Sequence, residues 1–178
     1  GITMIGESKV QEVTSKLSHL APVQKHMIGS LQTNKARRAL EIFDVIQSVD
    51  RPRLASVLDR IAGEMSKKQE VFIEVKVSAE QTKQGISYDA ASEFIHTFDQ
   101  YQNLVLKGLM TIAPFDRSEQ ETRAVFQKFK TFFDAHKSFL GSQPVLSMGM
   151  TDDFEWAIEE GATMVRVGRA LFGERNKI

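Results

Sequence analysis

The chain has 178 residues and no cysteine, and its 23 Lys and Arg balance its 23 Asp and Glu. This length suits a domain with a substantial core, and zero net charge excludes the basic footprint of a general nucleic-acid or anionic-membrane binder. The lack of cysteine excludes disulfides, thiolate metal sites and cysteine nucleophiles. No apolar run reaches the roughly 18 residues of a membrane span and no signal-peptide pattern is seen, so we expect a soluble, cytoplasmic protein.

Short apolar runs alternate with longer amphipathic runs along the whole chain. The apolar runs predict strands at Ile2–Gly6, His26–Gly29, Asp44–Val49, Val71–Val77, Leu104–Ile112, Val145–Met148 and Thr163–Val167. The amphipathic runs predict helices at Ser8–Leu20, Asn34–Ile42, Arg51–Lys67, Asp89–Tyr101, Ser118–Phe139 and Asp153–Glu160. No linker or low-complexity tract divides the sequence, which favours a single domain over residues 1–178.

Helical spacing and end signals support these assignments. Two apolar stripes recur at helical period, and we expect both to pack on a sheet: Leu54, Val57, Leu58 and Ile61, then Phe126, Phe129, Phe132 and Phe133. Ser118 and Glu121 form a capping-box pattern ahead of the second stripe. Asp152 or Asp153 is suited to cap the last long helix, and Gly161 to end it.

Strict alternation of strands and helices predicts a parallel sheet covered by helices. A doubly wound sheet and a (β/α)8 barrel both satisfy it, but no G-x-G-x-x-G turn supports a dinucleotide fold. In Val165-Arg166-Val167 the valines would face helices while Arg166 points inward, where a charge needs a partner. We therefore favour the barrel. Only seven strands are predicted, so one unit of an eight-stranded barrel is missing.

The ends of the last two strands are the best candidates for a binding site. Functional groups of such barrels lie at the carboxyl ends of strands, and phosphate often binds after the last two. Here one strand continues into Ser147-Met148-Gly149-Met150-Thr151 and the other into Gly168-Arg169-Ala170. Hydroxyls, glycines and backbone N–H groups suit a phosphate, although ordinary turns have the same composition.

Other polar residues give weaker signals. The four histidines, His19, His26, His96 and His136, lack the spacing of a metal site, so no metal is predicted. His26 lies at a strand start and is interpreted as a packing residue, and the Asp152-Asp153 pair as a helix cap.

Several segments, in order along the chain, resemble the pyridoxal phosphate homeostasis protein family. Gly6-Glu7-Ser8 followed by Gln11-Glu12 is similar to its G-E-N-x-x-Q-E segment, and His26 through Lys35 to its H-x-I-G-x-L-Q-x-N-K segment. Further similar segments are Gln47-Ser48-Val49-Asp50, Lys83-Gln84-Gly85-Ile86, Gly108 to Ile112, Leu146 to Asp153 and Val165 to Gly173.

This resemblance implies a barrel like the N-terminal domain of alanine racemase that binds pyridoxal 5′-phosphate. It implies a role in cofactor homeostasis without established turnover, as a monomer or weak homodimer. The phosphate cradle would comprise Ser147, Met148, Gly149, Gly168 and Arg169, and Arg166 would face the pyridine nitrogen. A guanidinium cannot accept a proton and disfavours a pyridinium beside it, which suits binding better than broad electron-sink chemistry.

Three departures from the family pattern stand out. The family's cofactor lysine lies on the first barrel strand, ahead of the G-E-N segment, and the resemblance implies that this strand is absent from the chain. Lys35 and Lys83 are candidate substitute amines, although a solvated or salt-bridged role also fits them. Ser8 replaces an Asn, and Arg169 a small hydroxyl residue. Two alternatives stay open: an amino-acid racemase-like enzyme, and an interaction module that has lost the cofactor. Two unpaired edges, Ile2–Gly6 and Thr163–Val167, should face a gap, and we expect them to be covered or the native chain to be longer.

Overall fold

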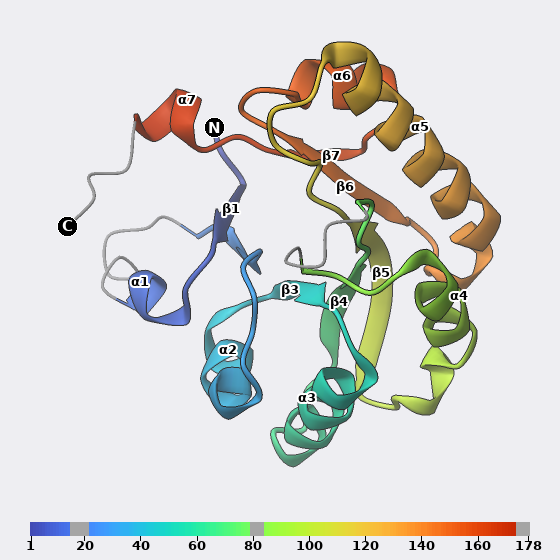
Figure 1. The fold of residues 1–178 in the computed structure, drawn as a ribbon. Coiled ribbons are helices and arrows are strands. Elements are labelled where there is room, and N and C mark those ends of the chain that lie inside the picture. The colour runs from blue at the N-terminus through green and yellow to red at the C-terminus, as the bar shows by residue number, and fades with distance from the viewer. Residues whose placement is uncertain (15–21, 79–83, 174–178) are drawn as a thin grey trace.

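The computed structural model describes residues 1–14, 22–78 and 84–173. Seven parallel strands form one sheet in sequential order, as Figure 1 shows. They are β1 (Met4–Glu7), β2 (Gln24–Met27), β3 (Val45–Val49), β4 (Gln69–Glu74), β5 (Leu104–Met110), β6 (Val145–Met150) and β7 (Met164–Arg166). Each strand predicted from the sequence is confirmed, with shifts of a few residues at its ends.

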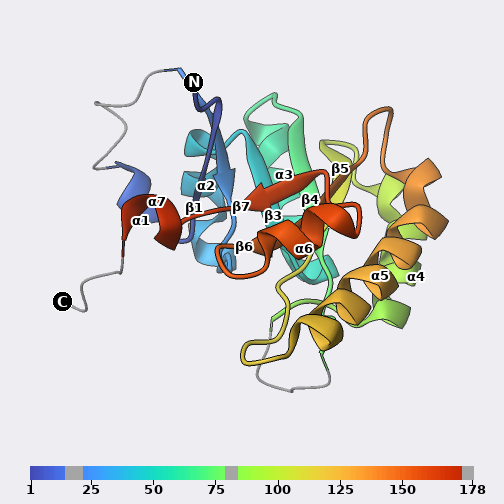
Figure 2. The same ribbon diagram turned by 90° about the horizontal axis from the view of Figure 1, so that it is seen from above.

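Helices lie on the outer side of this curved sheet (Figures 1 and 2). They are α1 (Val10–Thr14), α2 (Ala36–Ile42), α3 (Pro52–Glu64), α4 (Tyr88–His96), α5 (Glu119–His136), α6 (Phe154–Glu159) and α7 (Arg169–Phe172), with 3₁₀ turns η2 (Thr33–Lys35), η3 (Phe98–Gln100) and η4 (Lys137–Phe139). The six predicted helices are confirmed, although residues 15–20 of the first lie outside the described ranges. In those ranges no helix has both the length and the apolar character needed to cross a membrane.

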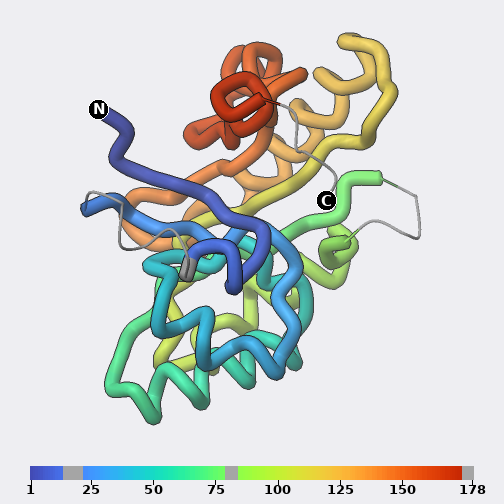
Figure 3. The backbone as a smooth tube through the Cα atoms, turned by 90° about the vertical axis from the view of Figure 1, so that its left-hand side faces the viewer, coloured from blue at the N-terminus to red at the C-terminus, as the bar shows by residue number. Residues whose placement is uncertain are grey.

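The sheet follows the barrel topology, because each strand pairs in parallel with its neighbour in sequence. Within the described residues β1 and β7 are not paired with each other, so the barrel is nearly closed and has the two edges expected from the sequence. Figure 3 views the molecule from the side of β1, where the N-terminal segment crosses in front of the sheet.

Apolar side chains fill two regions of the molecule. The larger region lies between sheet and helices and includes both predicted stripes, of which Leu54, Leu58, Ile61, Phe126, Phe129 and Phe133 are buried. The smaller region is inside the barrel, where Val45, Phe72 and Met110 pack with Val145 and Met164. Each of the five strands from β3 to β7 thus contributes one apolar side chain to this smaller region.

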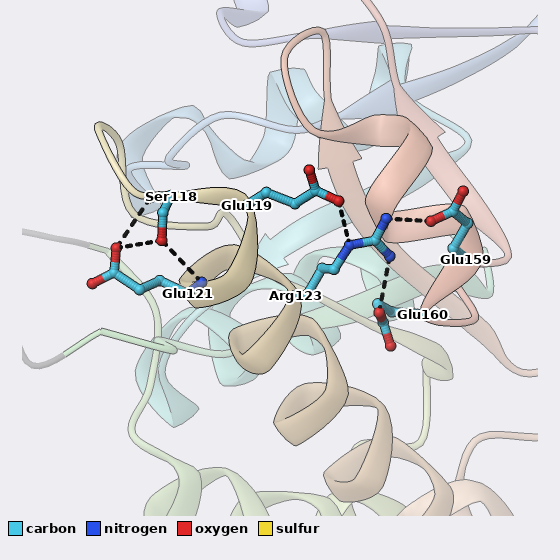
Figure 4. Close-up of polar contacts among 6 residues, drawn as sticks. All are labelled: Ser118, Glu119, Glu121, Arg123, Glu159 and Glu160. Atoms are coloured by element: carbon cyan, nitrogen blue, oxygen red, sulfur yellow. Dashed lines mark hydrogen bonds and ion pairs between the residues drawn. The ribbon is translucent and has the colours of Figure 1, made fainter.

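Two polar clusters on α5 fix the helices that flank the last strands (Figure 4). The predicted capping box is confirmed: the Ser118 hydroxyl accepts from the Glu121 backbone N–H, and the Glu121 carboxylate accepts from the Ser118 N–H. Further along, the Arg123 guanidinium binds Glu119 on its own helix, and Glu159 and Glu160 at the end of α6. These hydrogen bonds raise the pKa of Arg123. The cluster joins α5 to α6.

Candidate functional site at the ends of β6 and β7

A β-bulge shapes the end of β6. Ser147 pairs with Met164 and Met150 with Arg166, so two residues of β6 stand opposite one residue of β7. Gly149, within the bulge, has a φ of +91°, and a Cβ there would lie 2.5 Å from the Cβ of Ala157 on α6. Only glycine satisfies both conditions. The strand therefore turns tightly against α6 where the sequence predicted a phosphate cradle.

The two loops that follow β6 and β7 are held together by polar contacts. The Gly168 N–H donates to the Thr151 hydroxyl over 3.4 Å, and the Arg169 guanidinium binds the Asp152 carboxylate. Asp153 precedes α6, but its carboxylate accepts from the Met150 N–H at 2.5 Å and does not cap the helix. The interpretation of the Asp152-Asp153 pair as a side-chain cap is therefore wrong: one carboxylate closes the turn, and the other joins the loops.

Arg166 points into the barrel, as strand alternation predicted. Its Nη1 donates to the Ser147 hydroxyl at 2.7 Å, and its Nη2 donates to the Thr111 carbonyl at 2.7 Å. Burial lowers the pKa of Arg166 to about 10, against the opposing charges of Glu74 and Asp153. The side chain therefore remains a cation at neutral pH, fixed to β5 and β6 by two hydrogen bonds.

The Ser147 hydroxyl continues this network across the barrel. It donates to Gln47 Oε1 on β3 at 2.7 Å, and Gln47 Nε2 contacts His26 Nδ1 on β2 at 2.8 Å. The side chains of Ser147, Gln47 and His26 are all buried, and the His26 ring meets Phe72 edge-on. His26 is therefore more than the packing residue expected from the sequence.

Glu74 adds a second ionisable group to the interior. It ends β4, is 3% exposed, and has no hydrogen bond or ion pair to another described residue. Burial and the nearby charge of Asp50 raise its pKa to about 7, although Arg166 pulls that pKa down. A carboxyl that is buried with no hydrogen bond from the described residues is costly, and ionisable groups with a shifted pKa concentrate at functional sites.

The structure places the six predicted site residues together at the ends of β6 and β7. Their side chains differ in direction, because Met148 is buried in the core with the helices, whereas Arg166 and Ser147 bond to each other inside the barrel. Of the two substitute amines, Lys35 lies in η2 after β2, and Lys83 lies outside the described residues.

Sequence reasoning gave no functional role to four polar groups: His26, Gln47, Glu74 and Thr111. Gln47 and Glu74 occur inside apolar strands, in Val45-Ile46-Gln47 and Phe72-Ile73-Glu74. A polar residue at such a position is the sequence feature that could have indicated a functional role. A polar side chain in a strand buried on both faces needs a partner or a ligand.

The donor set fits a phosphorylated pyridine ligand. A hypothetical Cβ on Gly168 meets nothing within 4 Å, so the space beside this backbone is open to a ligand. Two buried polar atoms, His26 Nε2 and Ser48 Oγ, have no hydrogen-bond partner among the described residues and lie on the neighbouring strands β2 and β3. A fixed cation, glycine backbone and loop hydroxyls are the groups that bind phosphate and an electron-rich ring nitrogen.

Known proteins with a similar sequence or fold show to which family this chain belongs. Residues 1–176 match the family model described as alanine racemase, N-terminal domain. An alanine racemase from Clostridium difficile 630 has the same fold, with a TM-score of 0.81 at 15% identity, covering 99% of this chain and 46% of the racemase.

More similar relatives narrow the class. The chain is 39% identical to a pyridoxal phosphate homeostasis protein of Aquifex aeolicus over 98% of this chain and 78% of that protein. It is also similar to PipY of Synechococcus elongatus PCC7942, whose structure has PLP bound, with a TM-score of 0.86, 38% identity, and coverage of 94% of this chain and 80% of PipY. The chain belongs to the alanine racemase N-terminal domain family and, within it, to the pyridoxal phosphate homeostasis proteins.

Proposed function

We propose that this chain binds pyridoxal 5′-phosphate at the carboxyl ends of β6 and β7 and serves to hold the cofactor rather than to turn over a substrate. The observation that carries the proposal is the position of Arg166, a half-buried cation fixed by two hydrogen bonds beside the two glycine-containing loops. The PLP-bound relative PipY supports this choice of ligand.

The phosphate would rest on the backbone of the Ser147–Gly149 bulge and of Gly168. The bulge leaves Met148 and Gly149 opposite a single residue of β7, so part of this backbone is outside a regular ladder. The Ser147 hydroxyl already accepts from Arg166 and donates to Gln47, so its side chain positions Arg166. Arg169 would add positive charge at the rim, partly offset by the carboxylate of its ion-pair partner Asp152.

Arg166 would face the pyridine nitrogen. When bound, pyridoxal phosphate supplies a reactive aldehyde and an electron-withdrawing ring. A guanidinium donates hydrogen bonds and accepts none, so Arg166 keeps the ring nitrogen unprotonated. The ring is then a weaker electron sink, which favours storage and delivery of the cofactor over general amino-acid chemistry.

A titration of the purified chain with pyridoxal phosphate, followed by absorbance and fluorescence, tests binding directly. We expect saturable binding by the wild type and at least about tenfold weaker binding by Arg166→Ala, equivalent to about 1.4 kcal/mol. Arg60→Ala is the matched control, because Arg60 binds Glu64 on the outer helix α3. No saturable binding by the wild type overturns the proposal.

The mode of binding is tested on the same complex. Borohydride converts a lysine-linked cofactor into a stable secondary amine, and peptide mass mapping then identifies the lysine. Labelling of Lys35 or Lys83 supports a substitute amine, whereas an unlabelled chain that still binds supports non-covalent contacts alone.

The racemase alternative makes a different prediction in a chiral assay. Alanine racemase adds a catalytic tyrosine from a second domain, whereas Tyr88 begins α4 here and Tyr101 follows η3 and contacts the Pro52 carbonyl. Measurable interconversion of amino-acid enantiomers by this chain would contradict a holding role. Loss of cofactor binding with an intact fold would favour the interaction module.

Three further expectations stay predictions: a cytoplasmic location, a monomer or weak homodimer, and a single domain over residues 1–178. Cell fractionation, light scattering and limited proteolysis, respectively, check them.

A further inference from the structure

A chain of four side chains crosses the barrel interior from β7 to β2. It runs from Arg166 through Ser147 and Gln47 to His26, with contacts of 2.7, 2.7 and 2.8 Å. We call these four residues the interior relay. The four residues come from two pairs of consecutive strands, β2 with β3 and β6 with β7. The proposed ligand would contact only Arg166 and the Ser147 backbone directly.

The guanidinium of Arg166 and the orientation of the Gln47 amide give each link a direction. A guanidinium only donates, so Ser147 must accept from Arg166 with a lone pair. The hydroxyl proton of Ser147 is then available for Gln47 Oε1. Gln47 Nε2, which also donates to Met164 Sδ at 3.2 Å, faces His26, so Nδ1 of His26 accepts from it.

The last link fixes the state of the histidine. With Nδ1 as acceptor, His26 is neutral and carries its proton on Nε2, which has no partner among the described residues. Burial lowers the pKa of His26, against the opposing charge of Asp44 at the entrance to β3, and so favours the same neutral form. A protonated His26 would place an N–H against the N–H of Gln47, and the relay would have to reverse.

We propose that Gln47 and His26 are positioning residues that act through Ser147 to fix the orientation of the Arg166 guanidinium toward the ligand. Gln47 supplies the acceptor that commits the Ser147 proton, and His26 holds the Gln47 amide in the orientation that presents this acceptor. Neither residue touches the ligand. The inference rests on the proposed function for its ligand, but the relay itself exists in the ligand-free chain.

Nuclear magnetic resonance of the ligand-free protein tests the relay without any cofactor. We expect the His26 ring to be neutral at pH 7, with its proton on Nε2. In Gln47→Glu, the new carboxylate accepts from Nδ1–H, so the pKa of His26 should rise above its wild-type value. A wild-type proton on Nδ1, or an unchanged His26 pKa in Gln47→Glu, overturns the relay.

The link to Arg166 is tested with Gln47→Leu, which removes the acceptor. Gln69→Leu is the matched control, because Gln69 is also buried in the sheet but donates to the carbonyls of Asp44 and Glu70. We expect Gln47→Leu to shift the guanidinium nitrogen resonances of Arg166, and Gln69→Leu to leave them in place. Equal spectra for the two variants overturn the proposal.

Cofactor titration completes the test. We expect Gln47→Leu to bind pyridoxal phosphate about tenfold more weakly and to shift the pH profile of its absorption, while Gln69→Leu stays within about twofold of the wild type. If Gln47→Leu fails to fold, the isosteric Gln47→Glu replaces it, and an unchanged absorption profile then counts against the relay. Failure of the wild type to bind contradicts the proposed function, whereas the resonance experiments still decide the relay.

Discussion

Asp152 and Arg169 form an ion pair that joins the loop after β6 to the loop after β7. Both side chains are largely exposed, so this pair contributes little to folding. Its importance is local, because it places one negative and one positive charge at the rim of the proposed phosphate cradle.

Substitution of Asp152 by Asn should tighten cofactor binding by a few fold, because the carboxylate that offsets the Arg169 charge is removed. Arg169→Ser should weaken binding by a similar factor, since it leaves the Asp152 carboxylate near the phosphate. Titrations at low and high salt measure both effects, which should shrink as salt screens them. Opposite signs for the two variants are essential to the prediction, and equal weakening by both would contradict it.

Glu74 should make the free energy of unfolding depend on pH in the range between its ordinary pKa and its pKa in the folded chain. Its pKa rises from 4.5 to about 7 on folding, so the folded chain binds the proton more tightly than the unfolded chain. Stability is therefore greatest below about pH 4.5 with respect to this group and falls as pH rises through 7, by roughly 3 kcal/mol.

Urea unfolding of Glu74→Gln isolates this contribution. We expect the variant to gain up to roughly 3 kcal/mol over the wild type at pH 8 and much less at pH 5, because the amide carries no charge to bury. A constant difference between the variant and the wild type across this range would show that Glu74 does not titrate with folding.

Gly149→Ala should destabilise the fold by about 2 kcal/mol or more, because a φ of +91° and a contact of 2.5 Å to Ala157 are both unfavourable to a Cβ. Gly168→Ala is the control, since a Cβ there meets nothing within 4 Å and should change stability by less than about 0.5 kcal/mol. Cofactor titrations should distinguish an effect on binding from an effect on stability. Gly168→Ala should weaken cofactor binding, while its thermal midpoint stays near that of the wild type.

The two clusters of Figure 4 should respond differently to salt. Ser118→Ala removes a neutral cap and should cost about 1 kcal/mol at any ionic strength. Arg123→Met removes the ion pairs to α6, so its thermal midpoint should fall at low salt and approach that of the wild type at high salt. If the thermal midpoint of Arg123→Met fell equally at all salt concentrations, the loss would come from packing of the aliphatic part of the Arg123 side chain and not from its ion pairs.

The strands and the inward direction of the Arg166 side chain were predictable, because both follow from the spacing of apolar residues along the sequence. Apolar runs define each strand, and alternation in Val165-Arg166-Val167 places the charge inside. The Phe stripe of α5 was predictable for the same reason, since Phe126, Phe129 and Phe133 recur at helical spacing.

The relay was not predictable, because it depends on register between strands. Gln47 meets Ser147 one hundred residues away only because β3 and β6 close on the same interior, and no spacing in the sequence encodes that distance. The prediction that Asp153 caps α6 was wrong for a related reason. The bulge at Gly149 turns the chain so that the Asp153 carboxylate accepts from the Met150 N–H instead of from the first turn of the helix.

The fixed direction of the interior relay has a consequence for proton movement. Arg166 keeps its proton at neutral pH, and the Gln47 amide has no readily exchanged proton to pass between Ser147 and His26. The four side chains are therefore an insulator and not a proton wire, although they form a continuous hydrogen-bonded chain. The ligand at the Arg166 end would be cut off from His26 as a source of acid or base, which leaves Glu74 as the ionisable side chain of the interior closest in charge interaction to Arg166.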